Sequence, residues 1–299
     1  MRGIEKVRLL TGVCLLLFAA QVPAQFDDVS IETTHVNGAV SMLEGYGGNL
    51  AVMTGADGIL LVDDQYAPLT DRILAAIATI DPGQVRFLIN THWHPDHTGG
   101  NEQLGSMGSV IVAHDNVRQR MSSDQFVAAI DRTFPASPEG ALPVVTFSDR
   151  VTFHFNGEAV TAYHVANAHT DGDSIIHFPA SNVIHMGDNF FNGRYPLVDL
   201  SNGGSITGMI DAVQFALGLC ESGTRVIPGH GPLANCADLE TFGQMLADAT
   251  ERVRQLMASG KSRDEIIAMR PNAELDGRLG NGSIKPDQFT RFIYDSLAQ

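Results

Sequence analysis

Short runs of apolar and β-branched residues, separated by glycine-containing turns, occupy the first part of the chain. Alternation of this kind is typical of β-strands, and it predicts strands over residues 35–43, 49–54 and 59–62. From Leu69 to Ile80 the apolar positions recur at helical spacing, which predicts a helix that ends at Asp81-Pro82-Gly83. A further strand, residues 87–89, leads directly into a segment rich in histidine.

The rest of the chain alternates between predicted strand pairs and amphipathic helices. We expect a hairpin over residues 151–165 and strands at 110–112, 175–178, 183–186 and, as the last strand, 226–227. We expect a short helix from Asn101, longer helices over 206–217, 239–257 and 289–297, and another that begins at the capping-box pattern Ser262-Arg263-Asp264-Glu265. Residues 115–148 predict an irregular, proline-containing connection. This order fits a two-sheet core with outer helices, although periodicity alone does not exclude other mixed folds.

The first two dozen residues have the layout of a secretory signal. Arg2, Lys6 and Arg8 precede an apolar run over 9–20, and small residues follow at 22–24. We therefore expect residues 1–24 to be removed on export, so that the protein is periplasmic or secreted. An N-terminal membrane anchor is the alternative, but the apolar run is short for a bilayer span.

The formal net charge of −15 on 299 residues limits the classes of partner. A chain this acidic has no electrostatic footprint for nucleic acid or anionic lipid. We expect a small-molecule substrate, no nucleic acid, and no membrane contact once the signal is removed. The length and the 44% hydrophobic content support a sizeable core. We expect residues 25–299 to form one domain, with a helical C-terminal part from about residue 238.

Two cysteines remain once Cys14 leaves with the signal. Cys220 and Cys236 bracket the segment that carries His230, so a disulfide between them would hold that loop. Two free thiols are equally compatible with the sequence. Neither cysteine has the spacing of a structural zinc or redox motif.

The chemistry of the chain is concentrated in Thr91-His92-Trp93-His94-Pro95-Asp96-His97, directly after a buried strand. His92 and His94 are two residues apart, so on extended backbone they point to the same side. Pro95 forces a turn, after which Asp96 and His97 can face the same space from another direction. Imidazole and carboxylate ligands suit zinc and similar divalent metals.

Three later segments place single histidines or aspartates beside predicted strands. They are Ala168-His169-Thr170-Asp171, His185-Met186-Gly187-Asp188 and Pro228-Gly229-His230-Gly231. Each is weak evidence alone, because a polar residue at a strand end is usually an ordinary hydrogen-bonding group. Together they supply the extra ligands that a second metal ion needs.

This order of motifs, from about residue 36 to 235, resembles the metallo-β-lactamase superfamily. The resemblance implies an α+β fold, a four-layer αββα sandwich with the metals at one edge of the paired sheets. It implies two divalent ions, most consistent with zinc. The implied ligands are His92, His94 and His169 for the first ion, Asp96, His97 and His230 for the second, and Asp188 as a bridge. It also implies that the Asp63 carboxylate accepts a hydrogen bond from the outer ring N–H of a metal-binding histidine and so fixes the orientation of that ring. The competing interpretation is that Asp63 is an ordinary turn residue.

The resemblance implies hydrolysis by a hydroxide held between the metals and oriented by Asp96 as the catalytic carboxylate. Asp188 stands where some β-lactamases have cysteine, which is more similar to glyoxalase II. The lysine that often binds a β-lactam carboxylate is missing, and Arg194 is a candidate replacement. Tyr46 ends an apolar segment that can overhang the site, and it is a second candidate substrate contact.

Export and the β-lactamase-like scaffold favour a cyclic, β-lactam-like amide as substrate, with a lactone, ester or thioester as the alternative. Two alternatives belong to other classes. One is a mononuclear iron oxygenase, against which the seven intact ligand positions argue. The other is a non-catalytic exported protein that binds metal.

Overall fold

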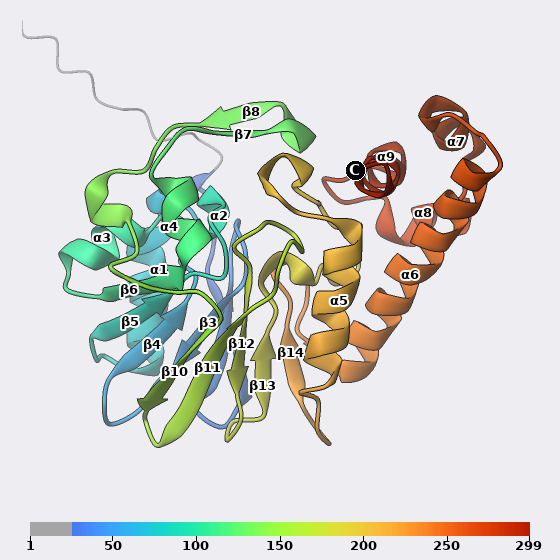
Figure 1. Cartoon of the computed structure of the whole chain (residues 1–299). Coiled ribbons are helices and arrows are strands. Elements are labelled where there is room, and N and C mark those ends of the chain that lie inside the picture. The colour runs from blue at the N-terminus through green and yellow to red at the C-terminus, as the bar shows by residue number, and fades with distance from the viewer. Residues whose placement is uncertain (1–25) are drawn as a thin grey trace, which may run out of the picture.

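Two β-sheets lie face to face, and helices cover the outer face of each (Figure 1). The computed structural model describes residues 26–299, so the expected secretory signal over residues 1–24 lies outside the described residues. The predicted αββα sandwich is confirmed. None of the helices within residues 26–299 is long and apolar enough to span a bilayer.

The first sheet has seven strands, in the order β1-β2-β3-β4-β5-β6-β9. Its centre is buried on both faces, because β3 and β4 consist only of buried residues. Strands β4, β5, β6 and β9 run parallel, so their carboxyl ends reach the same edge. The strands are β1 (Glu32–Asn37), β2 (Val40–Glu44), β3 (Leu50–Met53), β4 (Ile59–Val62), β5 (Val85–Ile89), β6 (Val110–His114) and β9 (Val145–Phe147).

The second sheet has six strands, in the chain order β10 to β15. The predicted hairpin is confirmed, since Phe155 pairs with Glu158 across the turn at Asn156-Gly157. Strands β13 and β14 run parallel, and each ends close to a polar segment. The strands are β10 (Arg150–Phe155), β11 (Glu158–His164), β12 (Ser174–Phe178), β13 (Val183–His185), β14 (Arg225–Ile227) and β15 (Ala234–Asn235).

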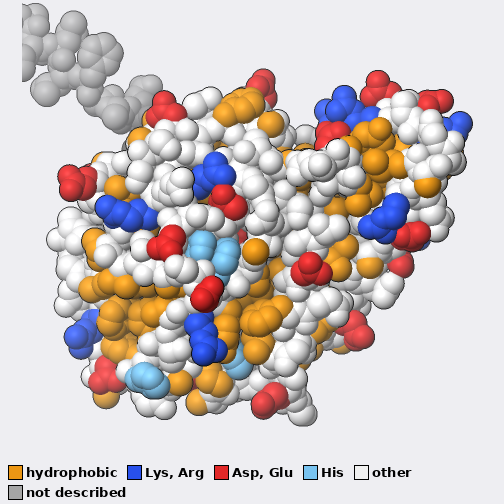
Figure 2. All heavy atoms as spheres, viewed as in Figure 1, with side chains coloured by type: hydrophobic (Ala, Val, Ile, Leu, Met, Phe, Trp, Pro, Cys, Tyr) orange, Lys and Arg blue, Asp and Glu red, His pale blue; other side chains and the backbone are white. Residues whose placement is uncertain are grey.

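Apolar side chains fill three successive layers. One cluster packs α1 against the first sheet, one lies between the sheets, and the largest packs α5, α6 and α9 against the second sheet. On the face shown in Figure 2, acidic and basic side chains are interspersed around apolar patches. The helices are α1 (Thr70–Ile80), α2 (Pro95–Thr98), α3 (Asn101–Ser106), α4 (Asp115–Met121), α5 (Ile206–Leu217), α6 (Cys236–Ala258), α7 (Arg263–Met269), α8 (Ala273–Leu279) and α9 (Pro286–Leu297).

The sequence prediction differs from the structure at four places. The single strand expected over 35–43 is two strands, because the chain reverses at Gly38, whose φ of 54° suits glycine. The irregular connection expected over 115–148 contains α4, the hairpin of β7 (Gln125–Val127) and β8 (Arg132–Phe134), and β9. Residues 226–227 are not the last strand, because the short β15 pairs with β14. Helix α8 was not predicted.

Cys220 and Cys236 form a disulfide. It joins the turn after α5 to the first residue of α6. The closed loop contains β14 and His230, so the bridge limits the freedom of that segment.

Candidate metal centre

All seven side chains predicted from the motifs converge at one edge of the paired sheets. His92 and His94 follow β5, and Pro95 begins the short helix α2 that carries Asp96 and His97. The other three follow strands of the second sheet: His169 lies between β11 and β12, Asp188 in a 3-10 turn after β13, and His230 after β14. Strand ends that meet at one edge therefore unite residues spread over the sequence.

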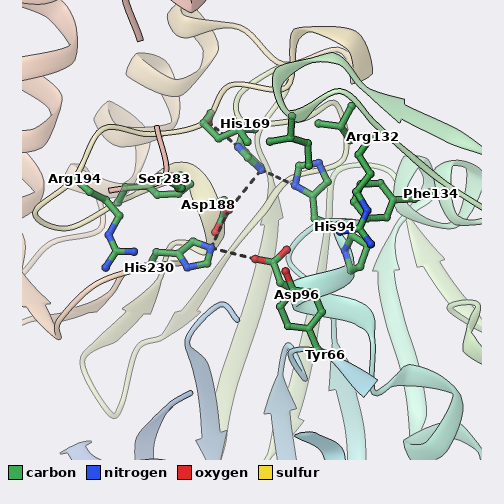
Figure 3. A pocket seen from close by; sticks show the side chains of 15 residues that line it. Tyr66, His94, Asp96, Arg132, Phe134, His169, Asp188, Arg194, His230 and Ser283 are labelled. Atoms are coloured by element: carbon green, nitrogen blue, oxygen red, sulfur yellow. Dashed lines mark hydrogen bonds and ion pairs between the residues drawn. The ribbon is translucent and has the colours of Figure 1, made fainter. Parts of the chain in front are cut away.

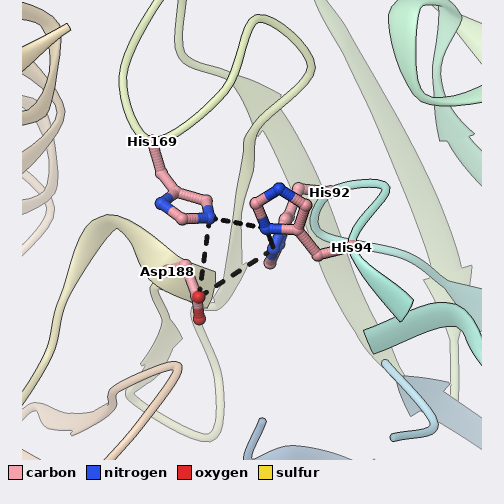
Figure 4. A group of neighbouring side chains, drawn as sticks. All are labelled: His92, His94, His169 and Asp188. Atoms are coloured by element: carbon pink, nitrogen blue, oxygen red, sulfur yellow. Dashed lines mark hydrogen bonds and ion pairs between the residues drawn. The ribbon is translucent and has the colours of Figure 1, made fainter. Parts of the chain in front are cut away.

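His92, His94, His169 and Asp188 form one group with a geometry that could hold a metal ion (Figure 4). Nδ1 of His94 lies 3.2 Å from Nε2 of His92 and 2.9 Å from Nε2 of His169. The carboxylate of Asp188 is 3.6 Å from His169 Nε2 and 3.9 Å from His92 Nε2. All four residues are buried.

Asp96, His97 and His230 form a second such group. His230 Nε2 lies 3.3 Å from the carboxylate of Asp96 and 3.4 Å from that of Asp188. His97 Nε2 lies 3.1 Å from the other oxygen of Asp188. Asp188 therefore lies between the two groups: its Oδ1 faces His97, and its Oδ2 faces His230 as well as His92 and His169.

Hydrogen bonds on the outer side of the rings decide where their lone pairs point. Asp63 Oδ2 lies 2.8 Å from His97 Nδ1, and Asp199 Oδ2 lies 3.0 Å from His94 Nε2. The carbonyl of Leu197 lies 2.9 Å from His169 Nδ1. An acceptor requires an N–H, so in each neutral ring the proton lies on the outer nitrogen. The inner nitrogens then present unprotonated lone pairs to one another.

Close lone pairs repel one another unless a cation lies between them. His97 Nε2 and Asp188 Oδ1 also point to a cation, because both atoms are buried and neither has a hydrogen-bond partner among the described residues. Buried polar atoms normally have a partner. The donor set of imidazoles and carboxylates with fixed outer N–H groups is the one that divalent metals bind in proteins. The residues present thus fit metal ions.

Charge interactions within the cluster shift the pKa values in opposite directions. Burial opposes the ionisation of Asp96, but His97 and His230 outweigh it and lower its pKa to about 2. Burial also opposes the protonation of His230, but Asp188 and Asp96 outweigh it and raise its pKa to about 9. Burial lowers the pKa of His169 to about 4, so this imidazole is neutral at pH 7.

Two glycines allow the backbone to approach the cluster. A Cβ on Gly48 would overlap the ring of His97, and one on Gly229 would overlap the carboxylate of Asp188. The peptide NH of Asn49 also donates to the carbonyl of Gly229, at 2.7 Å. Both turns therefore need glycine to bring the ligand-bearing loops together.

The cluster opens into a cavity of about 180 Å³ (Figure 3). Arg194 lines this cavity, as expected from the sequence. Tyr46 does not line it. Its ring lies 6.0 Å from that of Tyr66, and Tyr66 is the tyrosine that reaches the cavity. The expected contact through Tyr46 is therefore corrected to Tyr66.

Several supporting residues were missed by sequence reasoning. Asp199 and the Leu197 carbonyl have no recognisable motif, because they lie in an irregular segment before α5. His185, the last residue of β13, donates to the Asn49 carbonyl at 2.9 Å and accepts from the NH of Gly187 at 3.1 Å. It therefore holds the turn that presents Asp188.

Comparison with known families shows to which family the chain belongs. The family described as "Metallo-beta-lactamase superfamily" matches residues 44–233. The chain belongs to the metallo-β-lactamase superfamily. The predicted membership is confirmed.

The curated relatives that the chain matches have names that refer to different activities. The chain is 27% identical over 217 residues to "2,4-dinitroanisole O-demethylase subunit alpha" of Nocardioides sp., covering 70% of this chain and 60% of that protein. It is 27% identical over 204 residues to "Hydroxyacylglutathione hydrolase" of Nitrosococcus oceani, covering 66% of each. A second "Hydroxyacylglutathione hydrolase", from Erythrobacter litoralis, is 29% identical over 103 residues, 34% of this chain and 33% of that protein. The chain thus spans between a third and two thirds of these relatives.

Solved structures support the fold. A metallo-β-lactamase from Pontibacter korlensis matches with a TM-score of 0.60 at 20% identity, covering 73% of this chain and 99% of that one. The sec-alkylsulfatase Pisa1 from Pseudomonas sp. matches with a TM-score of 0.69 at 16% identity, covering 89% of this chain and 50% of that one. At these identities the likeness concerns the fold alone.

Proposed function

We propose that the protein binds two divalent metal ions, most consistent with zinc, and hydrolyses an activated acyl bond. His92, His94 and His169 hold the first ion, Asp96, His97 and His230 hold the second, and Asp188 lies between them. The observation that carries this proposal is the set of ring nitrogens that the outer hydrogen-bond acceptors turn toward one centre. Such an arrangement is costly without cations at its centre.

When bound, two such ions lower the pKa of a water molecule and polarise a substrate carbonyl. The chain's own residues supply the proton handling. Asp96 is ionised at neutral pH, since its pKa is lowered to about 2, and its side chain borders the cavity. Its carboxylate orients the attacking water and accepts a hydrogen bond from it. No serine or cysteine nucleophile is needed.

An ester or thioester is the substrate class that the site supports best. Asp188 occupies the position between the two groups, and the names of two relatives above describe hydrolysis of a hydroxyacyl thioester of glutathione. The cyclic amide favoured by the sequence is the second candidate. It is supported by the fold of the β-lactamase neighbours, which is weaker ground for a substrate.

A metal-dependent panel of substrates tests the proposal. Protein stripped of metal and reloaded with zinc is offered 4-nitrophenyl acetate, S-phenyl thioacetate, a chromogenic cephalosporin and a lactone. We expect hydrolysis only after reloading, and a loss of about a hundredfold or more in Asp96→Ala. Asp211→Ala, on the exposed side of α5, is the control and should retain its rate. No turnover of any substrate by the zinc-loaded protein would contradict the proposal.

Metal content and oxygen uptake of the purified protein distinguish the hydrolase from the two other classes of protein, an oxygenase and a non-catalytic metal-binding protein. One iron per chain with oxygen uptake would indicate the mononuclear oxygenase. Two zinc ions without turnover would indicate a non-catalytic metal-binding protein. We expect two divalent ions and no oxygen uptake.

We also infer that the protein is exported after removal of residues 1–24, leaving residues 25–299 as one hydrolase domain. The Cys220–Cys236 disulfide supports this inference, because such bonds persist in oxidising compartments. N-terminal sequencing of protein recovered from the periplasm or medium should begin near residue 25. An intact N-terminus in the membrane fraction would favour the anchor.

A further inference from the structure

Polar donors without protein partners lie on both sides of the cavity. Tyr66 and Arg132 lie on one side of Asp96 and Asp188, and Arg194 and Ser283 lie on the other (Figure 3). Among residues 26–299, none of these four side chains makes a hydrogen bond or ion pair. Most arginines elsewhere in the described chain are paired, for example Arg120 with Asp171 at 2.6 Å. These four unpaired donors line the cavity that a ligand would occupy.

Arg132 is held in place by its neighbour rather than by a carboxylate. It lies on β8, in the hairpin of β7 and β8 that projects beyond the two sheets (Figure 1), and it lines the cavity. Its guanidinium lies 4.8 Å from the centre of the Phe134 ring. A cation–π contact of this kind leaves the N–H groups of the guanidinium available for hydrogen bonds. A planar anion such as a carboxylate fits these N–H groups.

The same hairpin also lines the cavity with apolar side chains. Val127, Ile130 and Phe134 come from the hairpin, and Phe191 and Leu197 lie on the other side. Ile130 is 48% exposed, so part of its apolar side chain is accessible from the cavity. Apolar walls with a few placed polar groups are typical of sites for small molecules.

The charge balance of the cavity favours an anion. Its acidic lining residues are Asp96 and Asp188, which belong to the metal cluster, and its other charged residues are Arg132 and Arg194. Two divalent ions would outweigh the two carboxylates. The loaded cavity would then be positive on a chain whose formal net charge is −15.

We propose that Arg132 is a specificity-determining residue that binds an anionic group on an amphiphilic substrate. The apolar part of the substrate lies against Ile130 and Phe134, and Tyr66 donates to the same anion. This inference rests on the proposed hydrolytic function, and it narrows the substrate to acyl compounds that carry a free carboxylate or similar anion.

Two esters of equal chain length test the inference. They are 4-nitrophenyl heptanoate, which is neutral, and the mono-4-nitrophenyl ester of pimelic acid, which carries a free carboxylate. We expect zinc-loaded wild type to prefer the acid, and Arg132→Met to lower kcat/KM for the acid by about tenfold or more, with a much smaller change for the neutral ester. Arg132→Lys should restore part of the preference. Arg254→Met, on the exposed side of α6, is the control and should match wild type.

Binding without turnover provides an independent measurement. Calorimetry with metal-depleted protein compares 6-phenylhexanoate with its neutral amide. We expect the acid to bind more tightly in wild type and in Arg254→Met, and the difference to disappear in Arg132→Met and to shrink at high salt.

The outcomes separate this inference from the function on which it rests. Zinc-dependent hydrolysis of both esters at equal efficiency would overturn the role of Arg132 and leave the hydrolase intact. A preference for the acid that survives Arg132→Met but is lost in Arg194→Met would also overturn it. Failure of the zinc-loaded protein to hydrolyse either ester or any substrate of the panel above would contradict the hydrolase itself.

Discussion

The imidazole of His94 lies 3.0 Å from the carboxylate of Asp199, although 105 positions separate them in the sequence. This contact fixes the proton of His94 on Nε2 and turns Nδ1 toward His92 and His169. Asp199 also accepts hydrogen bonds from Ser201 and Asn202, at 2.6 and 2.7 Å, so it is itself held rigidly. The first group of ligands therefore depends on a carboxylate outside every recognised motif.

Replacing Asp199 with asparagine should weaken metal binding more than folding. The amide oxygen can still accept from His94, but the negative charge that raises the basicity of the imidazole is lost. We expect zinc affinity to fall about 10- to 100-fold, measured by competition with a chelator. Asp211→Asn, on the exposed side of α5, is the control. Unchanged zinc affinity in Asp199→Asn would show that Asp199 is only a structural residue.

Gly229→Ala should disturb the centre directly. The added Cβ would overlap the Asp188 carboxylate and come within 2.5 Å of the Gly187 carbonyl, so the backbone must move. We expect a loss of about 1–3 kcal/mol in the free energy of unfolding and fewer than two zinc ions per chain. Gly277→Ala in α8 meets no atom within 4 Å and should be neutral or slightly stabilising. Equal behaviour of the two variants in urea unfolding and metal analysis would rule out the close approach.

Removal of the disulfide should lower stability through the His230 loop. The two cysteines are 16 positions apart, and a closed loop of this length restricts the unfolded chain. We expect Cys220→Ser/Cys236→Ser to lower the free energy of unfolding by about 2–4 kcal/mol. Urea unfolding of wild type with and without reductant should show the same difference. If reductant has no effect on wild type, the bond does not form in solution.

A stacked histidine pair predicts a pH dependence of stability. His114 and His164 stack with ring centres 3.6 Å apart, and His114 Nδ1 accepts from the NH of Asn116 at the start of α4. Burial, and then His164, lower the pKa of His114 below its ordinary value. The unfolded state therefore binds a proton at a higher pH than the folded state, so stability is lost as pH falls below about 6.5.

His114→Asn tests this dependence, because asparagine can still cap the helix. We expect wild type to lose more stability than the variant between pH 7.5 and 5, measured by urea unfolding at each pH. The other buried histidines are common to both proteins, so the difference between them reports on position 114. Parallel losses in the two proteins would mean that this pair does not contribute.

Much of the fold could be predicted because its signals are local. The stripe from Leu69 to Ile80 and the hairpin turn at Asn156-Gly157 both follow from short-range periodicity and turn chemistry. The hairpin of β7 and β8 could not be recognised, because its strands have three residues each and are too short to establish alternation. Arg132, which lies on it, therefore had no reason to be considered part of the site.

In the candidate site too, residues close in sequence could be predicted, and contacts between distant residues could not. His92 to His97 are adjacent in sequence, so their joint role could be inferred from spacing alone. The places of His169, Asp188 and His230 beside predicted strands suggested that they add further ligands. Only the resemblance to a family assigned each of them to a metal, because periodicity does not reveal which strand ends meet. Asp199 and the Leu197 carbonyl could not be found, since a supporting contact across 105 positions is a property of the folded chain.

Anomalous diffraction at the zinc absorption edge, on crystals of the zinc-reloaded protein, tests the central claim most directly. The account predicts two peaks: one enclosed by His92, His94 and His169, and one enclosed by Asp96, His97 and His230, with Asp188 between them. A single peak, or peaks outside these two groups, would contradict it.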